Sequence, residues 1–128
     1  MNTSPNIFAR IFRWFDPRGR TLGDYGFILN RLTALGLTLY LFLHLIVLGN
    51  LARGPEAYWE FLVVIESPLY KIGEWLVIAA VLFHGLNGIR IGLNSFGIAV
   101  PQQRQYLIIV MLLSLIGVAF FGWKMFLG

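Results

Sequence analysis

The chain has 128 residues, of which 58% are hydrophobic and 12% are charged, so it is far more apolar than a soluble domain of this length. It contains no cysteine, which excludes disulfides, iron–sulfur clusters and thiolate metal sites within the chain. The net charge of +4 does not indicate nucleic-acid binding, because the basic residues stand at the ends of apolar runs rather than in one patch. We therefore expect one membrane domain covering residues 1–128.

The N-terminal stretch has arginines throughout and no apolar run long enough for a signal peptide, so we expect a mature N-terminus. From the charge distribution described below, we expect residues 1–29 to be a cytoplasmic segment. Within it, apolar residues recur at helical spacing, namely Ile7, Phe8, Ile11, Phe12 and Phe15. Arg10 and Arg13 fall on the opposite side. This pattern predicts an amphipathic helix lying on the inner membrane surface, with a disordered tail as the alternative.

Three stretches approach the roughly 20 apolar residues needed to cross a bilayer: residues 32–51, 72–91 and 106–126. Basic or aromatic residues bound each of them. Residues 52–71 form an outer loop, in which Pro55 and the aromatic Tyr58, Trp59 and Phe61 predict a short interfacial helix. Residues 92–105 form a cytoplasmic loop. The sequence therefore predicts an all-α membrane protein with three transmembrane helices.

The distribution of positive charge predicts the orientation. One side of the membrane carries seven basic residues: Arg10, Arg13, Arg18, Arg20, Arg31, Arg90 and Arg104. The other side carries only Arg53, Lys71 and Lys124. Because cytoplasmic segments are enriched in Lys and Arg, we expect a multi-pass protein of the cell (inner) membrane, with the N-terminus in the cytoplasm and the C-terminus outside.

His44 and His84 lie inside predicted spans, where ionisable residues are costly and usually functional. Small residues at Ala80, Gly88 and Gly92 leave one stripe of the helix around His84 nearly bare, so a flat macrocycle can lie against it. His84 is therefore a candidate axial ligand of a b-type haem. The alternatives are a neutral imidazole bonded to a neighbouring helix, and helix packing for the glycines.

Arg90 lies about 9 Å beyond His84 along the helix, within reach of a haem propionate near the inner surface. Its alternative role is that of an interfacial anchor. Measured from the flanking basic residues, His44 lies roughly 6 to 11 Å nearer the outside than His84. Together with helix packing at about 8–10 Å, this difference in depth indicates that the two histidines do not share one iron. If both are ligands, they serve two haems, and a partner chain or second copy supplies the opposing histidines.

Two motifs carry a family resemblance: Asn30-Arg31-Leu32-Thr33 before the first span, and His84-x-x-Asn87-Gly88-Ile89-Arg90 leading to Phe96-Gly97. With the three spans in order, the chain resembles the cytochrome b membrane-anchor subunit of succinate dehydrogenase, respiratory complex II. The resemblance implies half of a larger helical bundle, completed by a second anchor subunit and joined to iron–sulfur and flavoprotein subunits.

The same resemblance implies roles for individual residues. His84 is the haem ligand, and His44 is similar to the first-helix histidine of relatives that carry two haems. Arg31 lies by the quinone, where it offers hydrogen-bond donors with Asn30 and Thr33 close by. The alternative is that Arg31 only marks the edge of the span.

The chain departs from the family pattern at three positions. Many relatives have a serine where this chain has Phe27, which puts that contact to the quinone in doubt. Ala34 stands where a glycine is frequent, and Ser95 where an acidic residue is common.

We therefore expect an electron-transfer and anchor subunit, not an enzyme by itself, whose complex passes electrons from succinate to quinone through haem b. One alternative is the anchor of a quinol:fumarate reductase. The other is a haem-free transporter component in which His44 and His84 relay protons.

Overall fold

The computed structural model describes residues 6–16 and 18–128, which form helices and no strand. The elements are α1 (Ile7–Phe15), α2 (Leu22–Ala52), α3 (Pro55–Ile65), α4 (Pro68–Ser95), the short 3-10 helix η1 (Val100–Gln102) and α5 (Gln103–Phe126). Leu22–Ala52, Pro68–Ser95 and Val100–Phe126 are each long and apolar enough to cross a membrane. The predicted all-α architecture with three spans is confirmed.

The first long helix begins at Leu22 rather than at residue 32, because a capping box starts it. The Thr21 side chain accepts a hydrogen bond from the Asp24 N–H, and the Asp24 carboxylate accepts one from the Thr21 N–H at 2.9 Å. At 1.5 Å per residue this helix is about 46 Å long, so it extends well beyond a hydrocarbon core of about 30 Å. The hydropathy pattern identifies the apolar part of the helix but not its polar first turns.

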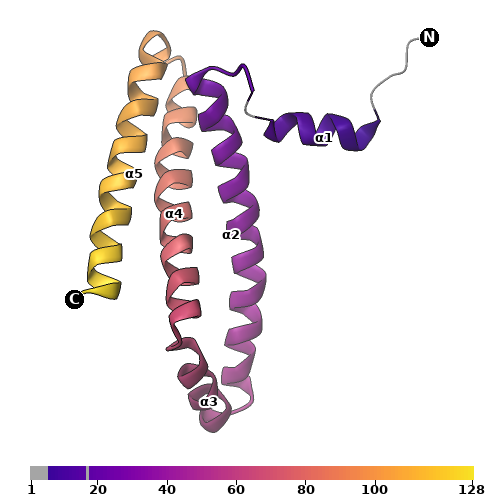
Figure 1. Cartoon of the computed structure of the whole chain (residues 1–128), viewed down its shortest axis with the longest axis vertical. Coiled ribbons are helices and arrows are strands. Elements are labelled where there is room, and N and C mark those ends of the chain that lie inside the picture. The colour runs from indigo at the N-terminus through magenta and orange to yellow at the C-terminus, as the bar shows by residue number, and fades with distance from the viewer. Residues whose placement is uncertain (1–5, 17) are drawn as a thin grey trace.

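The three long helices lie side by side, with α4 between α2 and α5 (Figure 1). Glycines allow α4 and α5 to approach closely: a Cβ on Gly117 would lie 2.8 Å from the Leu82 side chain, and one on Gly122 would lie 2.9 Å from Trp75 Nε1. The same Trp75 nitrogen donates a hydrogen bond of 2.9 Å to the carbonyl of Val118. Shape and one directed bond therefore fix the register of α4 against α5.

The buried core is small. Its apolar members are Ile28, Phe83, Leu107 and Val110, and its polar members are Asn87 and Ser114. Most other large apolar side chains of the long helices are exposed. Since such surface is stable only against lipid or other membrane helices, the arrangement suits the predicted larger bundle.

The short helices lie at the two ends of the bundle. Figure 1 shows α1 lying across the direction of the long helices, at the end where α2 begins and α4 connects to α5. Its residues Ile7, Phe8 and Phe12 are exposed, as a helix on a membrane surface requires, while the Phe15 side chain lies outside the described part. The helix α3 and the C-terminus lie toward the opposite end.

Candidate functional site

His84 faces α2 from the middle of α4 and is half-buried. Its Nδ1 lies 3.2 Å from the carbonyl oxygen of Asn30 and 3.3 Å from the Thr33 hydroxyl. Because a carbonyl oxygen can only accept, Nδ1 must carry the hydrogen and donate it. The other nitrogen, Nε2, then has a free lone pair, which is the form of imidazole that binds a metal.

The Thr33 hydroxyl reinforces this assignment. It lies 2.9 Å from the carbonyl of Leu29 and 3.0 Å from that of Asn30, so its single hydrogen is directed to the backbone of its own helix. Its oxygen therefore faces His84 as an acceptor. Both α2 atoms near Nδ1 are acceptors, and together they fix one tautomer and one ring orientation.

Asn87 connects this contact to Arg90. Its side chain is 0% exposed; its Nδ2 donates to Asn30 Oδ1 at 3.0 Å, and its Oδ1 accepts from Arg90 Nε at 2.9 Å. Asn30 thus binds His84 through its backbone and Asn87 through its side chain. Asn87 belongs to the predicted second-helix motif, but no role was predicted for it. The available signal was an amide three residues after His84 inside an apolar span.

One side of α4 next to His84 is open. We call Gly85, Gly88 and Gly92 the glycine face; a Cβ built on any of them meets no described atom within 4 Å. They contrast with Gly117 and Gly122, which pack against α4 side chains. The glycine face therefore does not serve packing among the described helices of this chain, and it leaves room for a flat group or a partner helix beside His84.

His44 lies in a different environment. It is exposed on α2, where its Nδ1 is 3.5 Å from the Tyr40 hydroxyl and its ring stacks on the Tyr40 ring at 5.5 Å between centroids. His84 is level with Thr33, and His44 follows Thr33 by eleven residues, so the two imidazoles differ in depth by about 16 Å at 1.5 Å per residue. They are too far apart to share one iron.

The depth difference of 6 to 11 Å predicted from the flanking charges was therefore too small. The estimate took Arg31 and Arg90 as markers of one plane. In the structure Arg31 follows Asn30, which lies level with His84, whereas Arg90 lies about 9 Å beyond His84 along α4.

Arg31 points away from the contact of His84 with Asn30 and Thr33. It lies about 100° around α2 from Asn30. Its guanidinium carbon is 4.1 Å from the centre of the Phe27 ring, a cation–π contact. Thus Asn30 and Thr33 are brought to His84, while Arg31 presents its guanidinium on another side of the helix, over the Phe27 ring.

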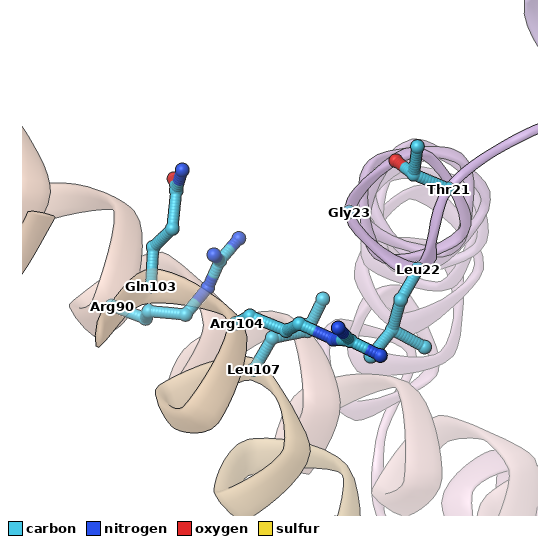
Figure 2. Close-up of a pocket in the computed structure, with 7 residues that line it drawn as sticks. All are labelled: Thr21, Leu22, Gly23, Arg90, Gln103, Arg104 and Leu107. Atoms are coloured by element: carbon cyan, nitrogen blue, oxygen red, sulfur yellow. The ribbon is translucent and has the colours of Figure 1, made fainter. Parts of the chain in front are cut away.

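Arg90 extends to the end of the bundle. Beyond its bond to Asn87, its side chain lines a pocket of about 550 Å³ together with residues at the starts of α2 and α5 (Figure 2). His84 lies six residues before Arg90 and about 120° away around the α4 axis, so the two side chains leave the helix in different directions.

A family model described as succinate dehydrogenase/fumarate reductase transmembrane subunit matches residues 11–121. The chain is 31% identical over 111 residues to the succinate dehydrogenase 2 membrane subunit SdhC of Mycobacterium tuberculosis, covering 84% of this chain and 80% of the relative. It is 29% identical over 98 residues to the succinate dehydrogenase hydrophobic membrane anchor subunit of Halobacterium salinarum, covering 76% and 73%.

We predict that Asn87→Ala destabilises the protein by about 1–3 kcal/mol, because it leaves Asn30 Oδ1 and Arg90 Nε without their buried partner. The control is Asn94→Ala on the same helix, whose side chain makes no hydrogen bond with a described residue. Thermal denaturation of the purified membrane complex measures both. Equal midpoints for the two variants would show that the hydrogen bonds of the Asn87 side chain contribute nothing to stability.

Proposed function

The chain belongs to the family of succinate dehydrogenase and fumarate reductase transmembrane subunits, and from this premise we propose that it is the haem-binding anchor of a succinate:quinone oxidoreductase. The membrane-anchor role follows from the family and from the three spans. The haem, the quinone contact and the direction of electron flow are the proposed part. The observation that carries the proposal is the hydrogen bond from His84 Nδ1 to the Asn30 carbonyl, which leaves Nε2 as a metal ligand.

The described residues fit a haem beside His84. Nε2 has no hydrogen-bond partner among them, and the glycine face offers open surface on the same helix. When bound, haem b supplies a one-electron redox centre within the membrane. The chain's own contribution is to orient the imidazole through Asn30 and Thr33 and to hold it in the ligating tautomer. Arg90 offers guanidinium donors toward a propionate, the role proposed for it from the sequence.

A haem held by two histidines would need its second histidine from a partner subunit. His44 cannot serve, because it lies about 16 Å from the level of His84 along α2, and the chain has no third histidine. The exposed apolar surface of the long helices gives a second anchor subunit a surface to pack on. We propose that His44, oriented by Tyr40, ligates a second, outer haem against another partner histidine.

Arg31 is proposed as a hydrogen-bond donor to the quinone. A quinone that is being reduced gains charge at its carbonyl oxygens, which a guanidinium stabilises. Of the predicted neighbours, Thr33 is engaged with the backbone and His84, whereas Asn30 keeps its Nδ2 hydrogens for a ligand, because its other groups face α4. Asn30 would then contact both the quinone and the haem ligand.

The charge distribution supports the proposed orientation. The described basic residues at the end of the bundle where α2 begins outnumber Arg53, Lys71 and Lys124 toward the other end (Figure 1). We propose that the crowded end is cytoplasmic and faces the iron–sulfur and flavoprotein subunits. The relatives' names favour succinate oxidation over fumarate reduction, and the family favours an anchor over a haem-free proton relay.

We expect His84→Leu to remove the haem nearer the cytoplasm from the purified complex, because leucine offers no ligand to iron. The visible spectrum of the reduced complex and its haem content measure the loss. His44→Leu is the comparison variant, since it should remove the proposed outer haem and leave the haem at His84 in place. A His84→Leu complex with the haem content and spectrum of the wild type would exclude the proposed ligand.

For the quinone role, we expect Arg31→Leu to lower the succinate:quinone rate about tenfold, the size of one lost hydrogen bond to a charged group. Succinate oxidation with a water-soluble dye as acceptor should persist, because the dye takes electrons before the membrane site. Arg53→Leu, at the opposite end of α2, controls for loss of an arginine. A quinone rate unchanged by Arg31→Leu would limit Arg31 to an anchoring role.

A further inference from the structure

A basic pocket lies at the end of the bundle where α2 begins and α4 meets α5. Figure 2 shows the Arg104 side chain extending from α5 toward Leu22 at the start of α2, with the Arg90 guanidinium on the side of Gln103. Gln103 and Thr21 add polar groups, and Leu22 and Leu107 add apolar wall. At about 550 Å³, the pocket is in the range of small-molecule sites.

The positive charge of this pocket is not neutralised within the described chain. Arg104 makes no hydrogen bond or ion pair with a described residue, and Arg90 bonds only the neutral amide of Asn87. The nearby carboxylate of Asp24 accepts from the Thr21 N–H and hydroxyl, both at 2.9 Å, and so is directed to the helix cap. Two guanidinium groups therefore share a pocket that has no anion of its own.

The level of the pocket is that of a membrane surface. It lies between the ends of three helices that are long enough to span a bilayer. Leu107 lines the pocket, is 1% exposed and packs on Gly26, where an added Cβ would lie 2.9 Å from the leucine side chain. Below this level, side chains such as Ile108 and Leu112 of α5 are exposed and apolar. A ligand in this pocket would have one end at the arginines and the other along the apolar side chains of α5.

We propose that this pocket binds the phosphate of an anionic phospholipid, whose acyl chains lie along the apolar surface of the helices. Basic pockets between transmembrane helices recognise anionic headgroups in this way, through guanidinium–phosphate hydrogen bonds. The pocket shares Arg90 with the proposed propionate contact, whereas Arg104, Gln103 and Leu22 belong to the pocket alone, so the test is made at Arg104. Lipid binding requires only that the chain spans a membrane.

The test uses the complex purified in detergent as wild type, Arg104→Gln, Arg104→Lys and Arg53→Gln. After exhaustive detergent washing, mass spectrometry measures the retained phosphatidylglycerol. We expect Arg104→Gln to weaken retention about tenfold, as loss of a charged hydrogen-bonding group does. Arg104→Lys should retain more lipid than Arg104→Gln, because it keeps the charge. Arg53→Gln, which removes a charge at the other end of α2, should match the wild type.

A second measurement identifies the ligand in the same preparations. Phosphatidylglycerol added to the washed complex should raise the thermal midpoint of the wild type and Arg53→Gln more than that of Arg104→Gln. Phosphatidylcholine and inorganic phosphate should not reproduce the effect. Equal protection by inorganic phosphate would overturn the lipid assignment. So would equal retention of phosphatidylglycerol by wild type and Arg104→Gln, which would favour an acidic segment of a partner subunit. A haem spectrum altered by Arg104→Gln with unchanged lipid retention would assign the pocket to a propionate and likewise contradict the proposal.

Discussion

The hydrogen bond between His84 Nδ1 and the backbone carbonyl of Asn30 is the contact on which the proposed chemistry depends. A backbone carbonyl has no rotamers and cannot donate, so it fixes the imidazole more strictly than a side chain would. It also joins α2 to α4 at the level where the haem is proposed. The same interaction therefore stabilises the packing of two spans and sets the tautomer of the ligand.

Burial makes this polar contact a structural constraint. Asn87 lies wholly out of solvent, and in an apolar surrounding each of its polar atoms needs a partner. Asn30 and Arg90 supply those partners and extend the chain of hydrogen bonds from His84 to the pocket at the end of the bundle. Apart from these contacts the chain buries few side chains, and much of its surface is apolar. Its exposed apolar surface therefore needs partner helices or lipid to cover it.

Sequence reasoning predicted the three spans, because they follow from runs of apolar residues, but it missed the capping box at Thr21 that starts the first long helix. It named His44 and His84 as candidate haem ligands, which stays a prediction, and placed them too close in depth, because arginine side chains do not mark a fixed plane. It assigned Asn30 and Thr33 to the quinone alone, whereas the structure directs both to His84. Contacts between residues more than 50 positions apart depend on how α2 and α4 are rotated, and one chain's pattern does not specify that rotation. Asn87 gained its role only from this packing.

The most direct test is to detect the ligating nitrogen itself. In the assembled complex, this chain would carry His44→Leu and ¹⁵N-labelled histidine, so that His84 is the only labelled ring. Pulsed electron paramagnetic resonance on the oxidised low-spin haem then reports which nitrogens couple to the iron. The proposed site predicts one strongly coupled ¹⁵N from this chain beside an unlabelled nitrogen from the partner. A haem coupled only to unlabelled imidazole nitrogens would contradict it.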